Sequence, residues 1–163
     1  MSTGPLTDAA IDAMDAGTEL DRLIAQHVFG YLWLEERHSM PGYEPDTGPI
    51  SWQGWIEPET GNVIFDITWR DATTLDQPQF SLEIAPAWQV MEHLMRKYTI
   101  VVELYPEVWG KQSAKFAYRT GSPSWTGWAD TMPLAICKAA LKMAGYFATL
   151  APTEPGVPPD DTK

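Results

Sequence analysis

The chain has 163 residues, of which 44% are apolar and 20% are charged. This length and composition are typical of one globular domain and exclude a wholly disordered or fibrous chain. Eleven Lys and Arg residues against 22 Asp and Glu residues give a net charge of −11. Phosphate backbones and anionic membrane surfaces repel so acidic a chain, so we expect no direct binding to nucleic acid or to membranes.

The cysteine content and the N-terminus indicate a cytoplasmic protein. Cys137 is the one cysteine, so no disulfide forms within the chain and a reducing compartment is favoured. The first 15 residues are acidic and lack the basic and apolar regions of a secretory signal. Residues 132–150 contain two lysines, which argue against a membrane span.

Two short helices are predicted near the N-terminus. Thr7 can cap the first, over residues 8–15. Thr18 can begin the second, with Asp21 at the capping-box position three residues later. Gly30 is the predicted end of the second helix.

Strand patterns follow the second helix. The aromatic-rich residues 31–34 predict a first strand. Residues 39–62 are dense in Pro and Gly, which predicts loops around short extended pieces. Residues 62–69 alternate in polarity and form the clearest strand pattern, and residues 71–79 predict a polar loop.

A third helix is predicted after Ser81, which is a plausible N-cap. Its apolar stripe has spacings of four, three and four and consists of Ile84, Trp88, Met91 and Met95. Ala87 and Leu94 widen this stripe, which we expect to pack on the core.

The C-terminal part predicts a strand pair and a last helix. Residues 99–105 and 115–120 are rich in strand-forming residues and are expected to pair across the loop between them. Thr131 is the predicted N-cap of the last helix. Lys138 and Lys142 are four residues apart and are predicted to share its outer face.

The order of elements predicts an α+β fold. Helices alternate with groups of strands that short turns connect, so we expect a mainly antiparallel sheet flanked by helices. A single domain should occupy residues 1–150. The acidic residues 151–163 contain four prolines and predict a disordered tail.

Three segments resemble one family when taken in order. They are MDAGTELD at residues 14–21 with LIAQHVFGY at residues 23–31, FSLEIAPAW at residues 80–88, and WADTMPLAICKAAL at residues 128–141. Over about residues 10–147 the chain resembles the phage ABA sandwich domain family of small bacteriophage proteins. The resemblance implies an α-β-α sandwich, a phage or prophage gene and a host bacterial cytoplasm, and it brings no catalytic residue. Residues 40–62 depart most from the pattern.

Familiar catalytic patterns are absent from the sequence. There is no Gly-rich phosphate loop, nucleophile elbow or HExxH motif. The three histidines are far apart, and Cys137 lies on an apolar helical stripe, where packing in the core is expected. We therefore predict no catalytic residue, no metal and no cofactor, with an unrecognised hydrolase as the minor alternative.

The eight tryptophans are the unusual feature of the composition. Five of them lie in or next to Gly/Pro-rich segments, where an aromatic ring either covers the core or forms a contact surface. Basic residues near these segments could accompany them in binding a small anion. The predicted ligand- or partner-binding residues are Trp52, Trp55, Arg70, Trp109, Lys115, Arg119, Trp125 and Trp128.

Three hypotheses about function follow. The first is a non-enzymatic phage accessory protein that sequesters or blocks a host component, either a host protein or a small nucleotide signal, to neutralise host defence. The second is an acidic protein that imitates nucleic acid and occupies a host nucleic-acid-binding protein. The third is a homo-oligomeric structural or regulatory phage protein.

Overall fold

The computed structural model describes residues 6–38, 50–61, 63–68 and 79–150. Within these residues the helices and strands alternate in groups, as the sequence predicts. In chain order they are α1 (Asp8–Asp12), α2 (Thr18–Leu23), the π-helix η1 (Ile24–Val28), β1 (Leu32–His38), β2 (Ile50–Ile56), β3 (Val63–Thr68), α3 (Ile84–Lys97), β4 (Ile100–Val108), β5 (Lys111–Tyr118), β6 (Ser124–Ala129) and α4 (Met132–Leu150).

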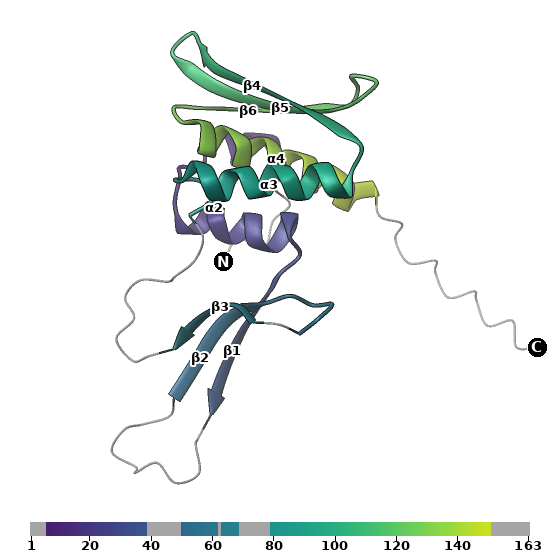
Figure 1. Cartoon of the computed structure of the whole chain (residues 1–163). Helices are drawn as coiled ribbons and strands as arrows, with labels where there is room; N and C mark the ends of the chain where they lie inside the picture. Colours follow the sequence, from purple (N-terminus) through teal and green to yellow (C-terminus); the bar gives the residue numbers. More distant parts are fainter. Residues whose placement is uncertain (1–5, 39–49, 62, 69–78, 151–163) are drawn as a thin grey trace, which may run out of the picture.

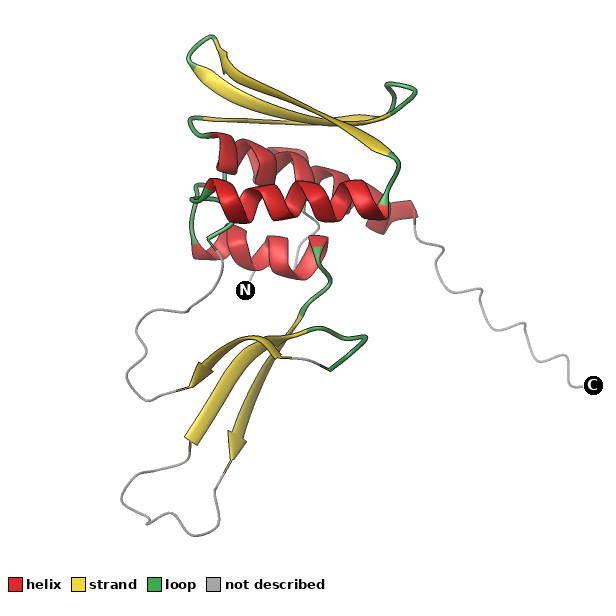
Figure 2. Cartoon of the chain, viewed as in Figure 1, coloured by secondary structure: helices red, strands yellow, loops and turns green. Residues whose placement is uncertain are grey.

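The strands form two antiparallel sheets, with orders β1-β2-β3 and β4-β5-β6. This confirms the predicted α/β class, but the prediction of one sheet flanked by helices is wrong in that the strands divide into two sheets. The helices lie on one side of β4-β5-β6, and no helix or strand of the described residues covers its other side (Figures 1 and 2). One face of this sheet therefore remains open.

The core lies between the helices and β4-β5-β6. Helix α4 is at its centre, and its side chains from Ala135 to Met143 are all buried. Strand β6 approaches this helix closely at Gly127, where a Cβ would lie 2.2 Å from the carbonyl oxygen of Ala135 and 2.7 Å from the nitrogen of Ala139. Only glycine fits at this contact.

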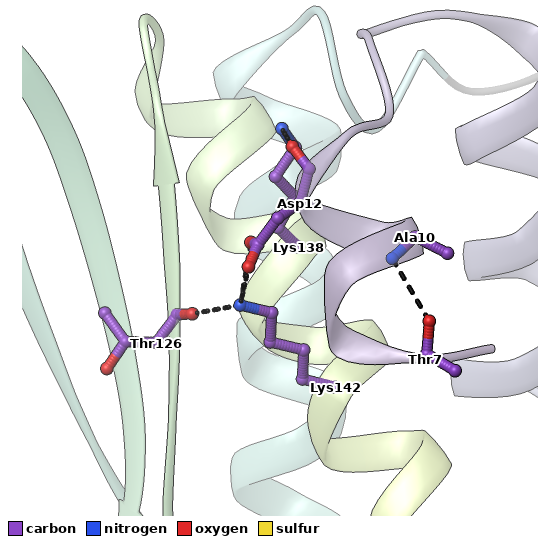
Figure 3. Close-up of polar contacts among 6 residues, drawn as sticks. All are labelled: Thr7, Ala10, Asp12, Thr126, Lys138 and Lys142. Atoms are coloured by element: carbon purple, nitrogen blue, oxygen red, sulfur yellow. Dashed lines mark hydrogen bonds and ion pairs between the residues drawn. The ribbon is translucent and has the colours of Figure 1, made fainter.

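The prediction that Lys138 and Lys142 share an outer face is wrong, because both are buried. The Lys138 Nζ donates to the Asp12 carbonyl at 2.8 Å. The Lys142 Nζ lies 2.7 Å from the Asp12 carboxylate and donates to the Thr126 carbonyl at 2.9 Å (Figure 3). Helix α1 and strand β6 thus approach this side of α4, and the two ammonium groups satisfy polar atoms there.

Of the helix N-caps predicted from the sequence, one is a local hydrogen bond, and hydrogen bonds between distant segments replace the others. The Thr7 cap is confirmed, since its Oγ1 accepts a hydrogen bond from the Ala10 nitrogen at 3.2 Å. The predicted capping box at Asp21 is wrong, because its carboxylate accepts from the Ser81 nitrogen at 2.7 Å. The Ser81 Oγ accepts from the Gly17 nitrogen at 2.9 Å instead of capping α3. These bonds join the start of α2 to the segment before α3.

The predicted core stripe of α3 is partly confirmed, since Ala87, Met91 and Leu94 of its six members are buried. Met91 is buried, but Ile84, Trp88 and Met95 are 52%, 48% and 42% exposed. The core-facing side of the helix consists of Ala87, Val90, Met91 and Leu94. Helix α3 is therefore rotated so that only one edge of its apolar stripe meets the core.

Strand β6 was not predicted from the sequence. Trp125 and Trp128 lie in or next to a segment rich in Gly and Pro, which favours a loop. The glycine inside the strand reflects the contact with α4, not a turn. Most of the predicted loop at residues 71–79, the tail at 151–163 and residues 39–49 lie outside the described residues.

Candidate functional site on the open sheet face

Alternation along β4 separates a covered face from an open one. Ile100, Val102 and Leu104 pack against the core. Val101, Glu103 and Tyr105 are exposed, as expected for side chains that point away from the helices. The cross-strand register continues this open face over β5 and β6.

The aromatic part of the open face is a row across the three strands. Tyr105 of β4 pairs with Ser113 of β5, and Ser113 pairs with Trp128 of β6. Tyr105 and Trp128 are each 43% exposed, whereas Ser113 is buried although it lies on the open face. Cross-strand neighbours stand close enough for two large rings to cover a small residue between them.

The next row of the open face is an ion pair. The Lys115 Nζ donates to a carboxylate oxygen of Glu103 at 3.0 Å, and the Tyr105 hydroxyl donates to the same oxygen at 3.0 Å. These bonds lower the pKa of Glu103, and the Glu103 carboxylate raises the pKa values of Lys115 and Tyr105. The charge of Lys115 is therefore matched within the face.

The β4–β5 turn extends the aromatic surface. Trp109 and Gly110 form the two-residue connection and have φ angles of 53° and 74°. Such turns favour Asn-Gly, because a bulky side chain is disfavoured at positive φ. Trp109 is nonetheless at the tip and is 94% exposed. An indole placed there in solvent contributes little to the fold of this chain.

The structure separates the eight predicted binding residues. Trp109 and Trp128 are exposed and Lys115 is half-buried, all on β4-β5-β6 or its turn, whereas Arg119 is exposed just after β5. Trp55 and Trp125 are buried in the core cluster, which fits the core-packing alternative. Trp52 belongs to β2, and its side chain, like all of Arg70, lies outside the described residues.

Sequence reasoning missed Tyr105 and Glu103 as members of this surface. The signal that could have found them is the alternation of residues 99–105, which places both on one face of the predicted strand. The tryptophans drew attention to loops, whereas the surface depends on strand register.

Among the described residues, no group of three His, Cys, Asp or Glu could hold a metal ion. Cys137 is fully buried, and burial raises the pKa of its thiol well above the ordinary value. A hollow of about 410 Å³ lies beside the α1–α2 connection, but its lining contains Asp15 and Glu19 and no basic residue. The open sheet face is the feature best suited to binding.

A comparison with models of known protein families gives the family of this chain. Residues 22–141 match the model described as the phage ABA sandwich domain. The chain belongs to the phage ABA sandwich domain family. No curated protein and no solved structure matches the chain. No helix in the part of the chain that the structure describes is long and apolar enough to cross a membrane.

Proposed function

We propose that this phage-family chain is a non-catalytic binding protein that attaches to a host protein through the open face of β4-β5-β6 and blocks it. Acting in the host bacterial cytoplasm, it would neutralise a host defence component. The observation that carries the proposal is the exposed row of Tyr105 and Trp128 on a sheet face that no described element covers. Large aromatic residues are the side chains that most often anchor protein interfaces.

The chemistry of the open face favours a protein over a small nucleotide. A nucleotide would need an unmatched cation beside an aromatic ring, but Lys115 is paired with Glu103. The one other basic residue predicted here that the structure describes, Arg119, lies beyond the end of β5. A surface of rings around a neutralised ion pair suits an apolar protein patch with a polar rim.

The experiment is an affinity capture from the host lysate with matched variants. Trp128→Glu places a charge in the aromatic row of the open face, on the edge strand β6, and Trp109→Ala removes the exposed indole at the turn. Trp88→Glu is the control, because Trp88 is similarly exposed but lies on α3. Circular dichroism should show the same fold for all four proteins.

The proposal expects one host protein to be captured by the unmodified chain and by the Trp88 variant. It expects at least about a tenfold loss of affinity in each sheet variant, since anchor residues of this kind carry much of the binding energy. Equal capture by the Trp128 variant would contradict the proposal. Calorimetry with cyclic and linear nucleotides tests the small-molecule version, and heat that Trp128→Glu abolishes would favour that version.

A further inference from the structure

The two edges of the sheet β4-β5-β6 differ in their surroundings. On the β6 side, α4 packs closely and the Lys142 Nζ donates to the Thr126 carbonyl of β6 at 2.9 Å. On the β4 side, no strand of the described residues pairs with the outer edge. An unpaired edge offers a row of backbone donors and acceptors that another extended segment can join.

The register determines which backbone groups of β4 point outward. The Tyr118 nitrogen of β5 donates at 3.3 Å to the carbonyl of Pro123, which directly precedes β6. Tyr118 therefore turns its backbone groups away from β4, and its partner Ile100 belongs to a pair without cross-strand hydrogen bonds. Because this direction alternates along a strand, the N–H and C=O groups of Val102 and Leu104 also point out of the sheet edge.

Residues 100–105 have few of the features that protect edge strands from pairing. Their one charged side chain, Glu103, is matched by Lys115 of the neighbouring strand. They contain no proline, and Pro106, which lacks an N–H, ends the segment. The edge available for pairing is therefore apolar and spans about 20 Å.

Helix α3 lies beneath this edge. It contacts β4, whereas α4 contacts β5 and β6, and it lies between the α2–η1 layer and the sheet (Figure 1). His93 marks the side of α3 that faces η1, since its ring lies 4.7 Å from that of Phe29 at the end of η1. At about 3.6 residues per turn, the exposed Trp88 and Met95 project from the opposite flank. That flank is the one toward the sheet edge.

The core is incomplete beside β4. Ile100, Val102 and Leu104 pack against the core but are half-buried. Ala114 and Phe116 on the neighbouring β5 are fully buried. A strand added to the edge would lie about 4.8 Å beyond β4. Its inward side chains would cover the half-buried β4 residues and the exposed apolar residues of α3 together.

We propose that the outer edge of β4 binds an extended segment of another protein as a fourth strand along residues 100–105. The backbone groups of Val102 and Leu104 supply the hydrogen bonds, and α3 supplies an apolar floor for alternate side chains of the segment. A second copy of this chain is disfavoured, because each copy carries a net charge of −11. The same charge favours a segment that is neutral or basic.

This site goes beyond the proposed function, because it is separate from the open face and takes a different protein. The open face is formed by outward side chains, whereas this site consists of an edge backbone and one flank of α3. A chain with both sites occupied would hold two proteins together.

Amide hydrogen exchange of the free chain tests whether the edge is available. The amides of Val102 and Leu104 should exchange fast, and those of Val101 and Glu103, which point toward β5, should exchange slowly. Slow exchange of all four amides at every protein concentration would show that a segment of this chain already covers the edge. Protection that grows with concentration would assign the edge to a second copy. Either result would overturn the proposal.

Peptide binding tests the occupant. The probe is the most enriched peptide from a random library of peptides of about ten residues, selected by mRNA display on the full chain. We expect alternate apolar residues and no net negative charge. Methylating one set of alternate backbone nitrogens should weaken binding at least about tenfold, and methylating the other set should change it less than about threefold. Equal effects of the two sets, or no enriched peptide, would overturn the proposal.

Variants of the chain locate the bound peptide. Leu104→Pro removes an outward N–H and should weaken binding at least about tenfold more than Leu104→Ala, which keeps it. Met95→Glu should weaken binding by removing part of the apolar floor. Trp128→Glu is the control and should leave peptide binding unchanged, so failure of this site and failure of the open face are distinguishable. Circular dichroism checks that each variant is folded. Peptide binding that only Trp128→Glu weakens would overturn the proposal and place the peptide on the open face.

Discussion

Helices α3 and α4 show opposite relations between sequence pattern and burial. Helix α4 carries two lysines spaced as an outer face would be, yet both are buried between α1 and β6. Helix α3 carries an apolar stripe of regular spacing, yet three of its four members are exposed. Position in the layers, more than the pattern of either helix, decides what is buried.

The difference follows from the number of neighbours around each helix. Strands β5 and β6 and helices α1, α3 and η1 surround α4, so even its polar positions must find partners. Helix α3 lies at the side of this layer, and one side of it meets the core. Its remaining apolar surface is available for another molecule, and the open face of β4-β5-β6 is available in the same sense.

The largest effect should come from the contact between β6 and α4. Gly127→Ala places a Cβ 2.2 Å from the Ala135 carbonyl oxygen, and backbone atoms on both sides cannot yield easily. We expect a loss of about 3 kcal/mol or more in the free energy of unfolding, measured by urea denaturation. Gly145→Ala in α4 is the control, since its Cβ would have 3.9 Å of space and alanine favours helix. Equal stability of the two variants would refute the close packing around α4.

The two sides of α3 give the next contrast. Leu94 is buried, and Leu94→Ala should cost about 3 kcal/mol through the cavity it leaves. Trp88→Ala should cost under about 1 kcal/mol, because Trp88 is exposed. Chemical denaturation of both variants checks the orientation of the helix. A larger loss for Trp88→Ala would mean that the stripe faces the core after all.

The buried Lys142 tests the comparison of the two helices at a polar residue of α4. Lys142→Met leaves the Asp12 carboxylate and the Thr126 carbonyl without their ammonium partner. Since Asp12 is partly exposed, we expect a loss of about 2 kcal/mol, below the range for a fully buried pair. Lys111→Met, which removes an exposed partner of Asp130, should change the unfolding midpoint little. Equal stability of the Lys142 and Lys111 variants would contradict the stabilising role of the buried Lys142 contacts.

The smallest effect concerns Asp21 and is a pH dependence. Burial raises the pKa of Asp21 above its ordinary 3.8, although hydrogen bonds from Ser81 oppose the shift. The folded chain therefore holds this proton more tightly than the unfolded chain. The stability contribution of Asp21 decreases as pH rises from 3.8 through the folded pKa.

Asp21→Asn removes this titration and keeps an acceptor for the Ser81 nitrogen. The stability of the wild type minus that of the variant should fall across this pH window and then stay constant. Denaturation at a series of pH values measures the difference. If the stability of the wild type minus that of the variant instead rises with pH, the Ser81 hydrogen bonds, which lower the pKa of Asp21, outweigh the burial that raises it.

Local chemistry made part of the fold predictable. The Thr7 cap, the strand β3 and the pairing of residues 99–105 with 115–120 depend on neighbours in sequence or on one hairpin, and the structure contains them. The roles of Asp21 and Ser81 depend on a contact over 60 residues. No local pattern contains that information.

The candidate site was predictable to a smaller extent. Composition pointed to tryptophans, and Trp109 and Trp128 are exposed as a contact role requires. Trp55 and Trp125 also lie close to Gly and Pro residues in the sequence, but both are buried. The distinction depends on which strand face meets the helices, and for β6 that face is set by the contact of Gly127 with α4. Sequence alone could not give that contact.

The most direct test of the account is the ¹⁹F NMR spectrum of the chain with fluorotryptophan at all eight positions, assigned by single Trp→Phe substitutions. A soluble paramagnetic probe should broaden the signals of Trp88, Trp109 and Trp128 at low concentration and spare those of Trp55 and Trp125. A Trp88 signal as protected as that of Trp55 would contradict the central claim that this chain leaves apolar side chains of α3 and one sheet face open for other molecules.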